Sequence, residues 1–121
     1  SEEYTILFRL AEMYLIRAEC KAMLNDVEGA KDDLNKIRNR AGIADTGANT
    51  QQDVLQAILN ERRLELFTEQ SHRFFDLKRT GNANEVLSIV KPNWRETNRV
   101  FPLPENELLL NQNLLPQNPG Y

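Results

Sequence analysis

Residues 10–24 read LAEMYLIRAECKAML and residues 26–42 read DVEGAKDDLNKIRNRAG, and this pair of stretches decides the fold class. In each stretch apolar residues recur three or four positions apart, which is the spacing of one face of an α-helix. Asn25 and Asp26 lie between the stretches and offer a stop for the first helix and an N-cap for the second. The sequence therefore predicts an antiparallel helical hairpin of about tetratricopeptide-repeat length.

The first helix of this hairpin carries two apolar stripes. One stripe holds Leu7, Leu10, Ala11, Tyr14, Leu15, Ala18 and Ala22, and the other holds Met13, Ile16, Cys20, Met23 and Leu24. A helix with two such stripes is expected to lie between partners on both sides, with Cys20 as a small core residue. The second helix has a narrower apolar face made by Ala30, Leu34, Ile37 and Ala41. We expect it to be more exposed and to end at Gly42, in the left-handed position, with Ile43 as the following hydrophobic contact.

Further helices follow the hairpin. Thr50 to Asp53 resembles a capping box, so a third helix is expected from there to about Gln70. His72 to Arg79 predicts a short helix that stops at Thr80-Gly81. Residues 85–90 predict a weak helical turn, with a strand as the less favoured alternative, and residues 91–94 predict a turn. Strand patterns are otherwise missing, so the sequence indicates an all-α fold.

The last residues have a different character. Residues 100–108 read VFPLPENEL and residues 113–121 read NLLPQNPGY. Proline forces the chain to run extended on either side of a brief helix that begins near Pro104. Because this ending is too apolar for a disordered tail, it predicts an extended Pro/Asn-rich strap laid over the helical body.

Composition limits the function classes. The 121 residues are 40% hydrophobic and 27% charged, which favours a single globular domain over residues 1–121, or part of one, and excludes disorder. The net charge of −3, with acids and bases interleaved, gives no basic field for nucleic acid or an anionic membrane. The single cysteine excludes an intrachain disulfide and a cysteine metal cluster. No stretch is long enough to span a membrane, and no signal peptide or lipobox stands at Ser1.

The densest mixture of charged and apolar residues lies at residues 58–79. Glu61, Glu65 and Glu69 share a helix face, and Glu69-x-x-His72 has the spacing found in di-iron carboxylate bundles. Such sites need two Glu-x-x-His copies, whereas this chain has one histidine. A metal-dependent carboxylate-bundle enzyme therefore stays only as an alternative to be tested, and we expect no metal and no other cofactor.

We instead expect these charges to form a structural ion-pair network, because half-buried charges must be paired. Its predicted members are Glu61, Arg62, Arg63, Glu65, Arg73 and Asp76. No nucleophile elbow surrounds any serine and no Gly-rich phosphate loop is present, so no catalytic residue is predicted.

Trp94 is the only tryptophan and the one weak candidate for ligand binding. An exposed indole could stack on a sugar ring. A lone tryptophan beside Pro92 is more often a plug that holds a strap in place, since the indole buries a large area. We favour the packing role.

Four segments resemble one family in order along the chain. They are Tyr14–Glu19 (YLIRAE), Leu34–Gly42 (LNKIRNRAG), Glu61–Arg79 (ERRLEL followed by RFFDLKR) and the ending, with FPLPENE at Phe101–Glu107 and QNPGY at Gln117–Tyr121. Each is similar to a signature in the C-terminal half of SusD/RagB proteins. Each segment alone is a modest match, but in this order over nearly the whole chain the four together are specific.

The resemblance implies an all-α fold built on tetratricopeptide-like hairpins. It also implies a surface-exposed lipoprotein of the outer membrane that binds glycans or other nutrients and hands oligosaccharide to a SusC-like TonB-dependent transporter, without enzymatic chemistry. The lipid anchor is absent from this chain, and we expect the chain to be a C-terminal fragment. No binding residue of the family maps onto a motif here, so none is carried over. The alternative is a cytoplasmic tetratricopeptide-type protein-interaction module.

Overall fold

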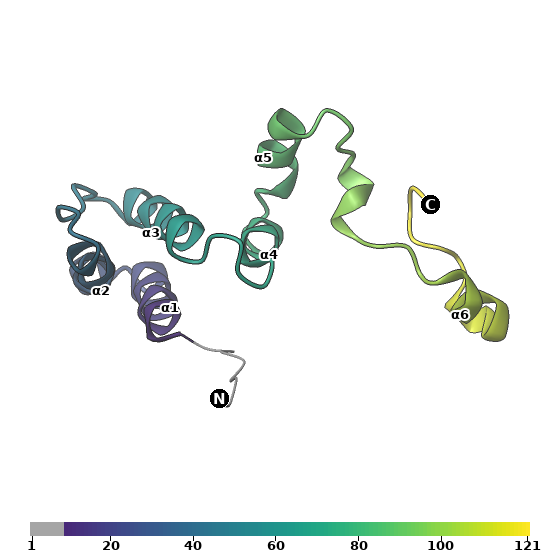
Figure 1. Cartoon of the computed structure of the whole chain (residues 1–121), viewed down its shortest axis with the longest axis horizontal. Coiled ribbons are helices and arrows are strands. Elements are labelled where there is room, and N and C mark those ends of the chain that lie inside the picture. The colour runs from purple at the N-terminus through teal and green to yellow at the C-terminus, as the bar shows by residue number, and fades with distance from the viewer. Residues whose placement is uncertain (1–8) are drawn as a thin grey trace, which may run out of the picture. The chain divides into compact units, whose positions relative to one another are not determined.

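The computed structural model describes residues 9–121 (Figure 1). Its α-helices are α1 (Leu10–Met23), α2 (Val27–Arg40), α3 (Gln51–Glu65), α4 (His72–Arg79), α5 (Ala83–Val90) and α6 (Glu105–Leu110), with short 3-10 helices at Glu96–Arg99 and Gln112–Leu114. Every regular element among the described residues is helical, which confirms the predicted all-α class. The chain divides into two compact units, residues 1–73 and 74–121, here called the N-terminal unit and the C-terminal unit. Leu7, which was expected on the first apolar stripe, lies outside the described residues.

The hairpin of α1 and α2 forms as its terminal residues indicate. Asn25 adopts a left-handed conformation after α1 (φ 65°), and the Asp26 carboxylate accepts the Gly29 N–H at 3.0 Å to cap α2. At the other end Gly42 has φ +72°. The N–H of Gly42 donates to the Asn39 carbonyl at 3.1 Å and that of Ile43 to the Arg38 carbonyl at 2.9 Å, a Schellman ending. The expected stop at Gly42 is confirmed.

The core of the N-terminal unit lies between α1, α2 and α3, with α1 packed against both of the others. Its buried members are Ala11, Leu15, Ala18, Ala22, Ala30, Leu34, Ile37, Val54 and Ile58. Four of these nine residues are alanines, three of them on α1, and small side chains let packed helix backbones approach closely. Of the predicted first stripe of α1, Ala11, Leu15, Ala18 and Ala22 are buried in this core and Tyr14 packs against it, whereas Leu10 is 72% exposed.

The second stripe of α1 is not buried, which corrects the expectation that α1 lies between partners on both sides. Met13 and Ile16 are 41% and 42% exposed, Leu24 is 83% exposed, and Cys20 is exposed as well. The periodicity identified an apolar face correctly, but within residues 9–73 the helices α2 and α3 pack on the opposite face only. The expectation that Cys20 is a core residue is therefore wrong.

Helix α3 begins as predicted and ends earlier. The Thr50 hydroxyl oxygen accepts the Asp53 N–H at 3.1 Å, which confirms the cap. The helix ends at Glu65 instead of near Gln70, because Thr68, Gln70 and Ser71 have positive φ values of 63°, 41° and 60°. Phe67, placed on the helix by its apolar character, is 72% exposed.

The C-terminal unit contains a small core at α4 and α5. Leu77, Ala83 and Leu87 are buried there, with Phe74, Val86 and Trp94 packed against them. The predicted short helix at His72–Arg79 is confirmed, and the segment at residues 85–90 is helical, as α5. None of the helices described between residues 9 and 121 combines the length and hydrophobicity needed to cross a bilayer.

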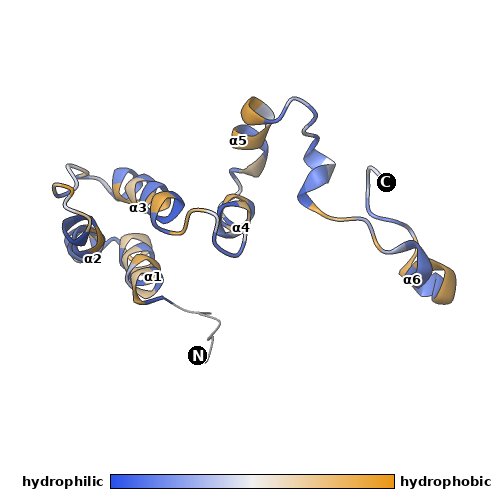
Figure 2. Ribbon diagram, viewed as in Figure 1, coloured by the Kyte–Doolittle hydropathy of each residue, from blue (hydrophilic) through white to orange (hydrophobic). Residues whose placement is uncertain are grey.

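The tail folds back on itself through side-chain amides. The Leu103 N–H donates to Gln117 Oε1 at 2.7 Å, and Gln117 Nε2 donates to the Leu103 carbonyl at 2.9 Å. Asn118 Nδ2 and Tyr121 OH donate to the carbonyls of Phe101 and Val100 at 2.7 and 3.0 Å. The brief helix expected near Pro104 is α6, whose apolar side shows as orange in Figure 2. That the strap lies over the helical body stays a prediction.

Candidate functional site

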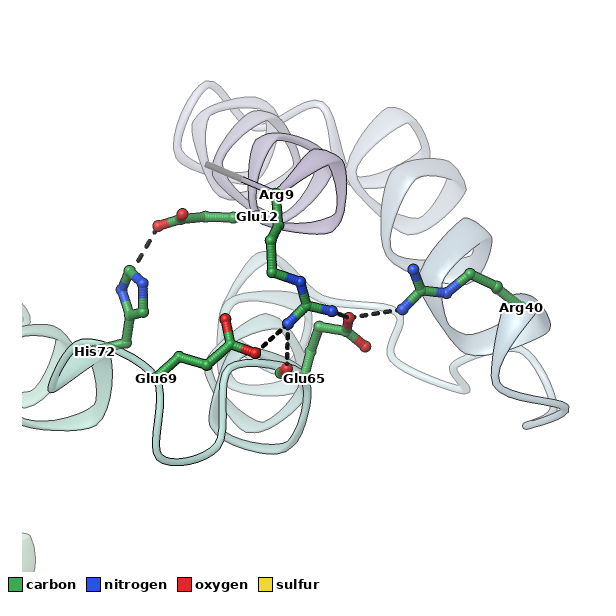
Figure 3. Close-up of polar contacts among 6 residues, drawn as sticks. All are labelled: Arg9, Glu12, Arg40, Glu65, Glu69 and His72. Atoms are coloured by element: carbon green, nitrogen blue, oxygen red, sulfur yellow. Dashed lines mark hydrogen bonds and ion pairs between the residues drawn. The ribbon is translucent and has the colours of Figure 1, made fainter. Parts of the chain in front are cut away.

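One group of polar contacts includes Arg9 and the carboxylates of residues 58–79 (Figure 3). The Arg9 guanidinium pairs with the carboxylates of Glu65 and Glu69 and donates to the Glu65 carbonyl at 3.0 Å. Arg40, from the last turn of α2, donates to Glu65 Oε1 at 2.6 Å. Glu65 thus joins the beginning of α1, the end of α2 and the end of α3.

Two neighbouring carboxylates are held in the same way. Glu12 Oε1 lies 3.6 Å from Arg62 Nη2 and 3.6 Å from His72 Nδ1. Arg38 Nη1 donates to Glu61 Oε2 at 3.1 Å. Glu61 and Arg62 are each only 4% exposed, so these charges depend on such partners for compensation.

The structure therefore gives the predicted ion-pair set partners that the sequence interpretation did not name. Glu61 is bound by Arg38 of α2, and Glu65 is bound by Arg40 of α2 and by Arg9, the residue before α1. Asp76 pairs with Arg79 at 2.9 Å. Arg73 is half-buried and Arg63 is exposed. The pairing of Arg62, Arg63 or Arg73 with acids inside the set stays a prediction.

The Glu-x-x-His pattern serves other contacts here. Glu69 binds Arg9, and His72 faces Glu12 (Figure 3). Over residues 9–121, no three His, Cys, Asp or Glu side chains gather in a way that could hold a metal ion. An arginine on a carboxylate competes directly with a cation for the same oxygens, so this arrangement fixes helices in place and is poorly suited to metal chemistry.

A second cluster surrounds Asp33 on α2, which is fully buried (0% exposed). Arg17 binds it through two parallel hydrogen bonds, Nε to Oδ2 at 2.7 Å and Nη2 to Oδ1 at 2.6 Å. Lys21 Nζ lies 2.9 Å from Oδ2 and Lys36 Nζ lies 3.3 Å from Oδ1. Three cations therefore share one carboxylate.

The hydrogen bonds from Arg17 hold the pKa of the Asp33 carboxyl well below its usual range, against the opposing effect of burial. The same hydrogen bonds raise the pKa of Arg17 above its ordinary value. The Tyr14 ring lies beside this cluster, with the Arg17 guanidinium carbon and the Lys36 nitrogen 5.2 and 5.1 Å from its centroid.

The sequence analysis missed Asp33. The available signal was an acid on the apolar face of a helix, between Ala30 and Ile37, opposite a helix with basic residues one turn apart at positions 17 and 21. An acid at a core position must find a cation, and this spacing offers two.

Trp94, the weak ligand-binding candidate, is half-buried. Its indole meets the Phe74 ring edge to face at 6.5 Å, and its Nε1 donates to Asn84 Oδ1 at 3.1 Å. Both the aromatic surface and the polar end therefore have partners inside the C-terminal unit, as in a packing role.

Comparisons of the sequence and the structure with known proteins agree on one family. The sequence model of the SusD family matches residues 1–121. The chain belongs to the SusD family. It is 34% identical over 134 residues to SusD-like protein P2 of Formosa agariphila, covering 96% of this chain and 26% of that protein. SusD-like protein P25 of the same organism is 36% identical over 130 residues, covering 96% of this chain and 24% of that protein.

Solved structures agree with the family assignment. A SusD-like protein from Bacteroides fragilis superposes with a TM-score of 0.79 at 29% identity, over 96% of this chain and 26% of that one. A SusD superfamily protein from Bacteroides vulgatus superposes with a TM-score of 0.82 at 27% identity, over 94% of this chain and 27% of that one. The chain therefore spans about a quarter of the length of the relatives it matches.

Proposed function

We propose that this chain is part of a glycan- or nutrient-binding protein of the SusD type. The observation that carries the proposal is the match of the SusD family over residues 1–121, supported by relatives that are themselves named SusD-like. The finer proposal is an outer-membrane, surface-exposed lipoprotein that captures oligosaccharide and passes it to a SusC-like TonB-dependent transporter. Lipidation supplies the membrane attachment in this proposal.

In this proposal the described residues act as a scaffold without catalysis. The carboxylates that a hydrolase or metal enzyme would use are bound to arginines: Glu61 to Arg38, and Glu65 to Arg9 and Arg40. An arginine bound to a carboxylate occupies the oxygens that a substrate or a cation would need. The cluster instead fixes the mutual positions of α1, α2 and α3.

A cytoplasmic protein-interaction module of the tetratricopeptide type is the second candidate. The antiparallel α1–α2 pair with its alanine-lined contact favours it, since such hairpins also build interaction scaffolds. The two candidates differ in where the protein resides in the cell and in whether its loss affects glycan uptake.

The experiment deletes the gene segment that encodes these residues in the native host. Growth of the deletion strain is then followed on a panel of polysaccharides. We expect growth to fail on at least one polysaccharide and to continue on its monosaccharide, with the intact protein in the outer-membrane fraction and co-purifying with a TonB-dependent transporter. Unchanged growth on every polysaccharide, together with recovery of the protein from the cytoplasm, would favour the interaction module.

A further inference from the structure

The turn between α3 and α4, residues 66–71, has a backbone conformation that its sequence disfavours. Thr68, Gln70 and Ser71 have φ values of 63°, 41° and 60°, in the left-handed region that glycine and asparagine enter most readily. Neither glycine nor asparagine stands among residues 66–71. Such a conformation persists only where the surrounding structure holds it.

The hydrogen bonds of the turn show where the strain lies. The Glu69 N–H donates to the Leu66 carbonyl at 3.1 Å, and the His72 N–H donates to the Glu69 carbonyl at 3.0 Å, so two tight turns follow one another. In the second turn both central residues, Gln70 and Ser71, have positive φ, as a type I′ turn requires. The sequence preferred there is Asn-Gly, so these residues do not select the turn by themselves.

Side chains from the beginning of α1 hold the turn in place (Figure 3). The Arg9 guanidinium donates to the Glu65 carbonyl at 3.0 Å and pairs with the carboxylates of Glu65 and Glu69. Glu12 Oε1 lies 3.6 Å from His72 Nδ1. We call these contacts of Arg9 and Glu12 the clasp, because they reach the start, the middle and the end of the turn.

The clasp is accessible to dissolved ions. The side chains of Arg9 and Glu69 are 32% and 38% exposed. Hydrogen bonds between charged groups are strong, but salt weakens ion pairs that water can reach. The core between α1, α2 and α3 is apolar and lacks this sensitivity.

We propose that residues 66–71 form a salt-sensitive latch. In the closed state the clasp holds the turn with positive φ and fixes the start of α4 to the end of α3. In the released state the clasp is broken, the turn leaves the left-handed region and the start of α4 moves away, while the core of the N-terminal unit stays folded. The proposal does not depend on which nutrient is bound.

Amide hydrogen exchange at Glu69 and His72 tests the latch, because these N–H groups close the two turns. At low salt, Arg9→Gln should accelerate their exchange at least about tenfold and change exchange at Leu34 in α2 by less than about twofold. The matched control is Arg40→Gln, which removes the other arginine from Glu65 and leaves Arg9 in place. It should change exchange at Glu69 and His72 by less than about twofold.

Salt supplies a measurement on the unaltered chain. Raising sodium chloride from about 0.05 M to about 1 M should accelerate exchange at Glu69 and His72 about threefold, since partly buried pairs are screened incompletely. In Arg9→Gln the same change should have little further effect at these two amides. Exchange that does not respond to salt in the unaltered chain would contradict the proposal, whether or not Arg9→Gln folds.

Relief of the strain supplies a third measurement. Ser71→Gly places at φ 60° the residue that adopts this conformation without strain, so the turn should depend less on the clasp. In this background Arg9→Gln should accelerate exchange at Glu69 and His72 less than about threefold, a coupling between the two sites. Equal acceleration in both backgrounds would overturn the proposal. Acceleration at Leu34 as large as at Glu69 would also overturn it, because Arg9 would then stabilise the whole unit and not the turn.

Discussion

The N-terminal and C-terminal units achieve order by different means. In the N-terminal unit, residues distant in sequence meet: Leu15, Leu34 and Ile58 from three helices are all fully buried. In the C-terminal unit the core is small, and even Leu87 keeps 8% of its surface exposed. Large apolar side chains stay in solvent in both units, such as Leu24 at 83% in the N-terminal unit and Leu110 at 84% in the C-terminal unit.

Polar groups divide in the same way. Carboxylates of the N-terminal unit bind arginines across helices, as Glu65 does with Arg9 and Arg40. In the C-terminal tail, amide side chains such as Gln117 satisfy nearby backbone groups. Stability within one chain is therefore unequal, and we expect the N-terminal unit to open last and the tail first.

The largest effect should come from removing a core side chain of the N-terminal unit. Leu34→Ala deletes a fully buried leucine and should cost about 3 kcal/mol of unfolding free energy, from lost burial and the remaining cavity. Urea titration followed by circular dichroism measures it. The matched control is Leu110→Ala in α6, 84% exposed, which should change stability by less than about 0.5 kcal/mol. Equal losses of unfolding free energy in the two variants would contradict the expected difference in stability between the units.

The next effect concerns the buried carboxylate. Asp33→Asn keeps the shape of the side chain but removes the charge that Arg17, Lys21 and Lys36 share, so at pH 7 it should cost about 2 kcal/mol. The same denaturant titration measures this loss. Glu28→Gln, a change to the 81% exposed partner of the pair with Lys31, is the control and should cost little.

The pH dependence of that loss has a definite sign. Arg17 lowers the pKa of Asp33 in the folded protein below its unfolded value of about 3.9. A lowered pKa contributes stability that is complete above the unfolded pKa and is lost as the pH falls toward the folded pKa. The difference between wild type and Asp33→Asn should thus be constant near neutrality and shrink below about pH 4. A difference that grows on acidification would contradict the assignment.

A smaller loss is expected at the helix junction. Glu65→Ala removes the acceptor of Arg9 and Arg40, whose side chains are 32% and 58% exposed and can return to water. The cost should be about 1 kcal/mol, seen as a lower melting temperature, with any ligand affinity unchanged. An unchanged melting temperature would remove the structural interpretation of this cluster and favour a functional one.

The hairpin was predictable because its signals are local. Apolar spacing located α1 and α2, and Gly42 and Thr50 mark a helix end and a helix start through their own conformation or side chain. The end of α3 was not predictable, because the apolar spacing continues through Leu66 and Phe67 while Thr68, Gln70 and Ser71 turn the chain with positive φ. None of these three residues is the glycine that usually announces such a turn.

The sequence could not indicate which arginines from other helices reach the carboxylates of the charged cluster. The sequence interpretation sought pairs within residues 58–79, whereas Glu61 is bound by Arg38 and Glu65 by Arg9 and Arg40, all earlier in the chain. Only the packing of α1 and α2 on α3 decides such pairings. The exposure of Cys20 could not be predicted either, because an apolar stripe identifies a helix face but does not show whether another element covers it.

A local loss is expected in the tail. Gln117→Ala removes both hydrogen bonds to the Leu103 backbone and the acceptor of the Asn118 N–H. Amide hydrogen exchange at Leu103 and Asn118 should accelerate about fivefold, as for roughly 1 kcal/mol of local stabilisation, with α1 and α2 unaffected. Gln112→Ala, at an exposed position between Leu103 and Gln117, is the control. Acceleration that spreads into the hairpin would show that the two units open together.

The smallest effect should be on sugar binding by the isolated chain. Calorimetry against a panel of soluble oligosaccharides should show weak binding or none, and Trp94→Ala should not alter it. The reason is that the Trp94 ring packs against Phe74 and its Nε1 donates to Asn84, so the side chain offers little free surface to a sugar. The variant should instead weaken the α4–α5 core, visible as faster hydrogen exchange at Leu77 and Leu87. Micromolar binding that Trp94→Ala abolishes would place a glycan site in this quarter of the family's length and make Trp94 a ligand-binding residue in place of a packing one.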